Sequence, residues 1–101
     1  MLEITWIKTK VMENDYFISK HADDERQNDN LTIQEIEEAI SNGIVIENYE
    51  NSGRGESCLL AGFTKKGKPI HAFCGTFKDS LVVITVYIPG PPKFKNIFER
   101  G

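Results

Sequence analysis

The sequence has few of the residues that define several common protein classes. Its 101 residues include only two cysteines and one tryptophan, so we expect no disulfide scaffold, and no Cys-x-x-Cys zinc motif occurs. No apolar run approaches the roughly 18 residues of a membrane-spanning helix. The first four residues also lack the basic and apolar stretches of a signal peptide. These absences predict a soluble, cytoplasmic chain without membrane association.

What is present has the composition of a folded protein. Hydrophobic residues make up 40% of the chain and charged residues 27%, which lies outside the range of disordered sequences. The length fits one domain with a modest core. We therefore expect a single domain over residues 1–101, with residues 95–101 as a frayed tail or part of a short docked helix.

Charge is divided unevenly along the chain. Residues 1–50 carry four Lys and Arg against twelve Asp and Glu, whereas residues 51–101 carry eight against three. This division predicts either an acidic and a basic face or neutralisation between the two halves across the fold. The net charge of −3 argues against strong non-specific binding of nucleic acid.

Two segments have helical periodicity. Residues 3–14 place apolar side chains along one stripe, although alternation at the start of this segment leaves a strand open. Residues 33–42 follow a capping box of Thr32 and Glu35, which marks a helix start. The almost wholly polar residues 21–30 are expected to form a loop or a solvated helical turn.

Five segments have the composition of strands: residues 16–19, 44–49, 57–63, 69–77 and 81–88. The last is rich in β-branched residues and apolar on both faces, so we predict a central strand covered by helices. Short turns between the last four favour antiparallel neighbours. Helices followed by such a meander predict an α+β fold of two layers, with two or three helices on an antiparallel sheet.

Short pieces of the sequence occur in an order that resembles a bacterial domain family. In order they are Ser19–Ala22, Glu25–Gln27, Asn30–Thr32, Glu38-Ala39, Gly43, Tyr49, Arg54-Gly55, Ser57–Leu59, Gly62, Gly67, Pro69–His71, Cys74-Gly75, Thr85–Tyr87 and Pro91–Lys93. The family is the domain of unknown function 4258, and the resemblance covers residues 16–94. One departure is Phe94, where the family commonly has Trp.

The resemblance implies a relationship with small bacterial toxins of the RelE, MqsR and BrnT type. These toxins pack helices on a curved antiparallel sheet, and many cleave mRNA. For this chain the resemblance implies a RelE-like fold, a toxin-like endoribonuclease activity, and two partners, RNA and a small zinc-ribbon antitoxin. The acidic first half departs from the strongly basic ribonucleases of the RelE type.

Cleavage of RNA by its own 2′-hydroxyl needs a base, an acid and cations that stabilise the phosphorane. His21 and His71, the only histidines of the chain, are the candidate acid and base because imidazole titrates near neutral pH. Arg26 and Arg54 are candidate phosphate ligands, since guanidinium binds phosphate with a fork of donors. Lys20 is a lesser candidate cation. No cofactor is required for this reaction.

Two tyrosines complete the candidate site. Tyr49 and Tyr87 are expected to stack on a base or to supply a hydroxyl group. Every candidate has a structural alternative as well: a hydrogen-bonded core histidine for His71, a helix-end hydrogen bond for His21, and an ion pair for Arg26. For the tyrosines the alternative is cross-strand packing.

Other chemistries have weaker support. His71 and Cys74 are three residues apart, so on a regular strand they face opposite sides, which disfavours a shared metal. The same geometry disfavours Cys74 as a nucleophile paired with His71, unless a bulge at Gly75 realigns them. The alternative function is a non-catalytic protein-interaction domain on the same fold. A ribonuclease requires both histidines and an arginine in one basic concavity, whereas an interaction domain buries its histidines and exposes an apolar patch.

Overall fold

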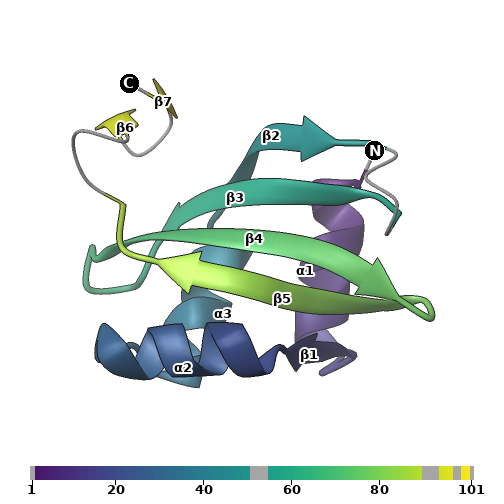
Figure 1. Ribbon diagram of the computed structural model, residues 1–101, viewed down its shortest axis with the longest axis horizontal. Helices are drawn as coiled ribbons and strands as arrows, with labels where there is room; N and C mark the ends of the chain where they lie inside the picture. The colour runs from purple at the N-terminus through teal and green to yellow at the C-terminus, as the bar shows by residue number, and fades with distance from the viewer. Residues whose placement is uncertain (1, 51–54, 90–93, 97–98, 101) are drawn as a thin grey trace.

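A five-stranded sheet and three helices form the fold (Figure 1). The computed structural model describes residues 2–50, 55–89, 94–96 and 99–100. The helices are α1 (Ile4–Met12), α2 (Lys20–Asn28) and α3 (Ile33–Ser41). The strands of the sheet are β1 (Tyr16–Ile18), β2 (Ile44–Tyr49), β3 (Ser57–Phe63), β4 (Pro69–Phe77) and β5 (Ser80–Tyr87).

The strand order in the sheet is β1-β5-β4-β3-β2. Strands β2 to β5 form the predicted antiparallel meander, and the α+β prediction is confirmed. The sheet is nevertheless mixed, because β1 runs parallel to β5, with Tyr16 opposite Leu81. A long connection through α2, α3 and three strands joins these two neighbours, so no hairpin constrains them to run antiparallel.

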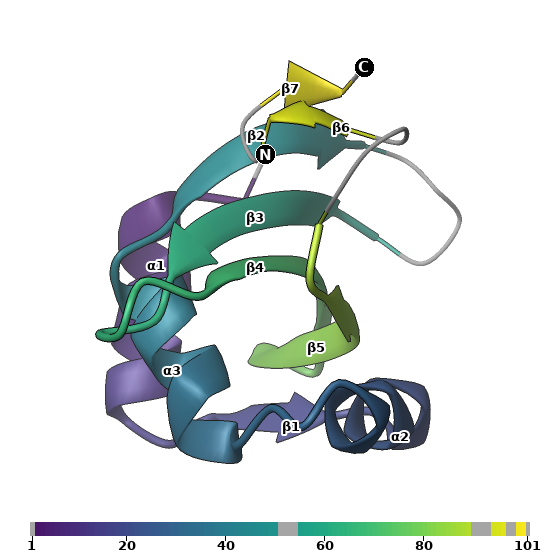
Figure 2. The ribbon, with the colours of Figure 1, turned by 90° about the vertical axis from the view of Figure 1, so that its left-hand side faces the viewer.

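One face of the sheet carries the core. Helices α1 and α3 cover this face (Figure 2), and α2 runs along the β5 edge beyond the end of β1 (Figure 1). Ile7 and Val11 of α1 and Ile36 and Ile40 of α3 are buried there, as the periodicity predicts. Helix α3 lies very close to β3, since a Cβ on Gly62 would come within 2.0 Å of a backbone oxygen of α3.

Side-chain caps explain where two helices begin. In the predicted box, the Thr32 hydroxyl accepts from the Glu35 N–H at 3.0 Å, and the Glu35 carboxylate accepts from the Thr32 N–H at 2.9 Å. The expectation of a loop or single turn over residues 21–30 is wrong, because α2 is a full helix. Ser19 caps it by accepting from the Ala22 N–H at 3.0 Å, and ion pairs three and four residues apart support its exposed face.

The described backbone of the tail, β6 (Phe94–Asn96) and β7 (Glu99–Arg100), forms a separate antiparallel pair of strands.

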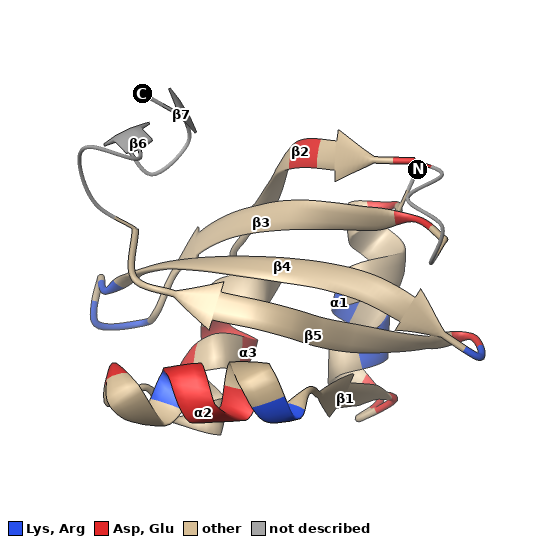
Figure 3. Cartoon of the chain, in the orientation of Figure 1, with Lys and Arg blue, Asp and Glu red and all other residues tan. Residues whose placement is uncertain are grey.

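Charges from the two halves of the chain meet in the fold. Lysines lie at the β3–β4 and β4–β5 turns, whereas acidic residues cluster on α2 and α3 (Figure 3). Lys68 and Glu35, from different halves, form an ion pair at 3.1 Å, which agrees with partial neutralisation across the fold. In the parts of the chain that the structure describes, no helix is both long enough and apolar enough to cross a membrane.

Candidate functional site

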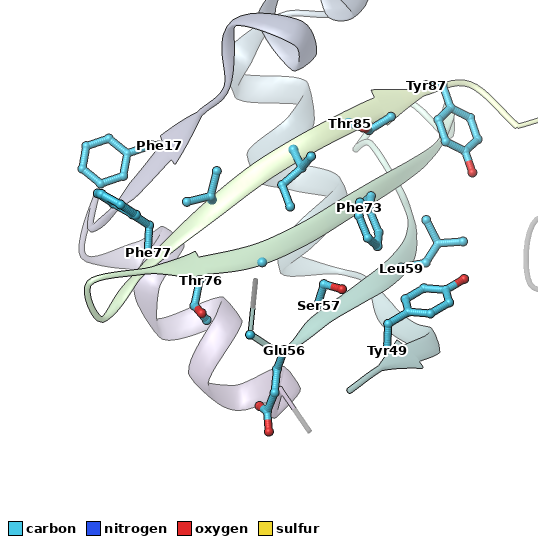
Figure 4. Close-up of a pocket in the computed structure, with 14 residues that line it drawn as sticks. Phe17, Tyr49, Glu56, Ser57, Leu59, Phe73, Thr76, Phe77, Thr85 and Tyr87 are labelled. Atoms are coloured by element: carbon cyan, nitrogen blue, oxygen red, sulfur yellow. The ribbon is translucent and has the colours of Figure 1, made fainter. Parts of the chain in front are cut away.

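A groove of about 950 Å³ lies on the face of the sheet opposite α1 and α3. We call this the open face (Figure 4). The described residues that line the groove are Phe17, Tyr49, Gly55, Glu56, Ser57, Leu59, Phe73, Gly75, Thr76, Phe77, Val82, Ile84, Thr85 and Tyr87. Its volume is at the upper end of the range for small-molecule sites, so it has room for a sizeable ligand or a segment of a partner.

Strand alternation builds the groove. On β4, Ile70, Ala72 and Cys74 point to the core, so the residues between them point to the open face. Strand β5 has a bulge at Ile84, where the register with β4 shifts. Because of this extra residue, both Ile84 and its neighbour Thr85 line the groove.

Aromatic side chains dominate the lining. Five of the ten aromatic residues in the chain line the groove rather than the core. Phe17 and Phe77 lie at one end and are each 56% exposed. At the other end, the rings of Tyr49 and Phe73 meet edge to face with centroids 5.7 Å apart. Exposed aromatics gathered in one concavity are typical of a binding surface.

Polar groups are few in this lining. Ser57, Thr76 and Thr85 contribute hydroxyl groups, and Glu56 is the one charged residue among the described lining residues. Nearby, the Lys78 ammonium lies 5.4 Å from the centre of the Phe77 ring. The described part of the groove thus offers apolar contact and hydrogen bonds but no basic lining for a phosphate.

Among the residues predicted from the sequence, the structure brings His71 and Tyr87 together. His71 is fully buried, its Nδ1 is 3.3 Å from the Tyr87 hydroxyl, and the two rings meet edge to face at 5.4 Å. Tyr87 lines the groove at the end where Tyr49 also lies, whereas His71 is opposite Tyr87 in the strand register and is not among the described lining residues. Of the seven residues that the sequence singles out, two therefore line the groove and a third contacts one of them.

The other predicted residues lie on α2 or, for Arg54, outside the residues that the structure describes. His21 has a side chain that is 68% exposed, and its Nε2 is 3.4 Å from the Glu25 carboxylate. Lys20 pairs with Asp24 at 3.1 Å. Arg54 lies outside the described residues. None of these residues is among the described lining of the groove.

Arg26 connects α2 to the loop that follows it. Its Nε donates to Asp23 at 2.7 Å, and its Nη1 donates to the Leu31 carbonyl at 3.2 Å. These contacts correspond to the ion-pairing alternative that the sequence leaves open for Arg26.

Ser19 and Glu25, which the sequence does not single out for chemistry, bond to backbone groups at the edge of β5 next to β1. The Ser19 N–H donates to the Val83 carbonyl at 2.9 Å, and the Ser19 hydroxyl donates to the Ile84 carbonyl at 2.8 Å. Glu25 accepts from the Val86 N–H at 3.0 Å. Both residues belong to the pieces that carry the family resemblance, and here they have a structural role.

The two cysteines face each other across β3 and β4 in the core. Cys58 and Cys74 are opposite residues in the register, and both are free and fully buried. Burial raises the pKa of the Cys58 thiol to about 11 and raises the pKa of the Cys74 thiol as well. Thiols with raised pKa values are poor nucleophiles and poor metal ligands. Within the described ranges, no group of three or more His, Cys, Asp or Glu side chains is placed to hold a metal.

The fold and the site together define a small α+β domain with an apolar, aromatic groove on an open sheet face. Comparison with known families matches residues 18–88 to the domain of unknown function DUF4258, and the chain belongs to this family. No curated protein and no solved structure matches the chain.

The sequence does not identify most of the groove. Phe17, Phe73 and Phe77 carry no signal of their own, because aromatic residues in strands ordinarily belong to the core. The available signal is the apolar character of both faces of residues 81–88, which predicts a strand covered by helices. The structure shows that one face packs on the core and the other lines the groove.

Proposed function

We propose that this chain is a protein-interaction domain that holds a segment of a partner protein in the groove on its open face. The observation that carries the proposal is the lining of the groove: five aromatic side chains, three aliphatic ones and no Lys or Arg among the described residues. Covering such a surface with apolar groups lowers the free energy, because apolar area is removed from water. A chain with a net charge of −3 also gives little general attraction for nucleic acid.

The placement of the candidate catalytic residues favours the same function. His71 is buried against Tyr87, whereas His21 is exposed on α2 beside Glu25. A mechanism with two histidines needs both imidazoles within reach of one phosphate. Arg26 is engaged with Asp23 and the Leu31 carbonyl, so its phosphate-binding role would require breaking those contacts.

The second candidate is the toxin-like endoribonuclease, paired with a small antitoxin. One observation favours it: His71 and Tyr87, two groups able to transfer protons, lie 3.3 Å apart beside aromatic rings on which a base can stack. In that case the partner segment in the groove would belong to the antitoxin, and RNA would compete with it for the same surface.

Two parallel binding experiments separate the two functions. One selects ligands of the chain from a displayed library of random short peptides, and the other incubates the chain with a pool of single-stranded RNA. We expect the folded chain to enrich peptides rich in apolar residues. A double variant, Phe17→Ser with Phe77→Ser, is expected to weaken their binding by about tenfold or more, because it removes the exposed aromatic end of the groove. Phe63→Ser is the matched control, since Phe63 is 38% exposed and outside the groove lining.

The outcomes are distinct. Enriched peptides that lose affinity with the groove variant but not with the control support the interaction domain. The interaction domain is contradicted if no peptide is enriched, or if the enriched peptides bind the groove variant as tightly as the wild type. Cleavage of the RNA pool that disappears in His71→Ala, while the variant stays folded, favours the endoribonuclease.

A further inference from the structure

The described lining of the groove is rich in apolar side chains but has few groups that can bond to a peptide backbone. We propose that the occupant is a basic amphipathic α-helix of a partner protein, with its apolar face turned into the groove. This inference rests on the proposed interaction function and names the conformation and chemistry of the partner segment. A helix bound in this way keeps its polar face in water.

Most polar groups at the floor of the groove already have partners in the protein. Strands β3 and β4 each pair with a neighbouring strand on both sides. The Tyr49 hydroxyl donates to the Glu47 carboxylate, and the Tyr87 hydroxyl lies 3.3 Å from Nδ1 of His71. The other polar side chains of the described lining are the carboxylate of Glu56 and three hydroxyl groups.

This small number of partners disfavours an extended occupant. Each residue of an extended segment brings one N–H and one C=O, and burying such groups without hydrogen bonds is unfavourable. An extended segment that follows the groove from Phe73 to Phe77 of β4 covers about 13 Å, which is about five residues with about ten such groups. A helix bonds its own backbone groups to one another, so it covers an apolar floor without needing partners from the lining.

The dimensions of the groove fit a helix. Phe17 and Phe77 lie at one end, and Tyr49 and Phe73 lie at the other (Figure 4). Spread over about 13 Å, the volume of about 950 Å³ corresponds to a width of roughly 9 Å, close to the ~10 Å diameter of a helix with its side chains. At about 1.5 Å per residue, apolar anchors that reach both ends lie about seven or eight residues apart, which places them on one helix face.

Charge determines the polar side of the helix. The chain has a net charge of −3, and Glu56 is the one charged residue among the described lining residues. Lys or Arg residues beside the apolar stripe complement this charge, whereas Asp or Glu residues there are repelled. The groove therefore favours a basic helix over an acidic one.

The test uses, as its probe, the library peptide whose binding depends most strongly on Phe17 and Phe77. We expect its circular dichroism to gain helical signal when it binds the full chain. Two α-aminoisobutyric acid residues on its polar side restrict the backbone to helical angles, so they are expected to strengthen binding several-fold by preorganisation. Proline in the middle of the peptide is expected to weaken binding by about tenfold or more.

A matched pair of variants tests the basic character of the helix. Glu56→Gln and Asp24→Asn each remove one negative charge, but only Glu56 lines the groove, whereas Asp24 is exposed on α2. We expect Glu56→Gln to weaken binding of the probe about twofold or more at low salt, and Asp24→Asn to have little effect. Equal affinities for the two variants would overturn the basic assignment.

The result that overturns the helix differs from the result that overturns the proposed function. A probe that gains no helical signal, and that α-aminoisobutyric acid weakens, overturns the helix and leaves the interaction domain intact. A dimer of the chain that sedimentation detects, and that Phe17→Ser with Phe77→Ser abolishes, also overturns it, because a second copy then occupies the groove. If no library peptide depends on the groove, both the helix and the proposed function are overturned.

Discussion

The Glu25 carboxylate on α2 accepts a hydrogen bond from the backbone N–H of Val86 on β5 at 3.0 Å. Strand β1 has only three residues and pairs with β5 as far as Val83, so a side chain takes over where the ladder ends. This contact ties α2 to the strand whose other face lines the groove. Glu25 thus holds α2 against β5 and also satisfies a backbone N–H at the edge of this strand.

Replacing Glu25 tests this contact. Glu25→Ala is expected to destabilise the fold by about 1–3 kcal/mol, because it leaves the N–H of the buried Val86 without an acceptor. Glu25→Gln keeps an acceptor oxygen and should cost less. Asp24→Ala, which removes only an exposed pair with Lys20, is the control and is expected to stay within about 0.5 kcal/mol in urea unfolding. Equal losses for Asp24→Ala and Glu25→Ala would contradict the assignment.

The contact between α3 and β3 depends on a residue without a side chain. A Cβ on Gly62 would lie 2.0 Å from the Ala39 carbonyl oxygen, so Gly62→Ala is expected to cost about 3 kcal/mol or more. Gly67 has a φ of +86° and nothing within 4 Å of the added carbon, so Gly67→Ala should cost about 1–2 kcal/mol from backbone strain alone. Thermal unfolding of the two variants checks the order.

The thiols provide a test of core integrity. With a pKa of about 11 for Cys58, about one thiol in a thousand is ionised at about pH 8, and burial restricts access to both cysteines. We expect the folded chain to react slowly with a thiol reagent and the unfolded chain to react rapidly at Cys58 and Cys74. Rapid labelling of the folded chain would show that β3 and β4 separate from the helices.

Stability is expected to fall in acid. Hydrogen bonds from Lys10 and Ser80 lower the pKa of Asp15, and those from Thr32 and Lys68 lower the pKa of Glu35. Since the folded pKa values lie below the ordinary values of 3.8 and 4.5, the stability that these groups contribute is fully present above those values. It is lost as the pH falls through the folded pKa values.

Melting temperatures across the acid range check this prediction. The wild type should show a plateau near neutral pH and a decline below the ordinary pKa values. Asp15→Asn should decline less steeply, because only one of the two carboxylates with a lowered pKa remains. An unchanged slope in that variant would exclude Asp15 as a source of the acid sensitivity.

Local patterns in the sequence predicted local structure well. The capping box of Thr32 and Glu35 and the β-branched run over residues 81–88 have short-range causes, and both elements form where predicted. A full helix α2 was not predicted, because its segment is almost wholly polar and one of its side chains, Glu25, bonds to a strand residue 61 positions away. Long-range contacts of this kind leave no periodicity in the sequence.

Local patterns indicate only part of how the candidate residues are arranged in space. His71 and Tyr87 meet because β4 and β5 are neighbours in a hairpin, which the sequence indicates. The distance of His21 from the groove lining depends on how α2 packs along β5, which no local motif determines. The placement of all three helices determines which face of the sheet stays open. The apolar strands alone do not show which face the helices leave uncovered.

Titration of the isotope-labelled chain with a selected peptide, followed by NMR chemical shifts, tests the central claim most directly. We expect the largest shifts at Tyr49, Leu59 and Phe73 in the groove, with little change on α2. Shifts centred on His21 and Arg26, or shifts produced by single-stranded RNA and not by the peptide, would contradict the assignment of the open face as a protein-binding surface.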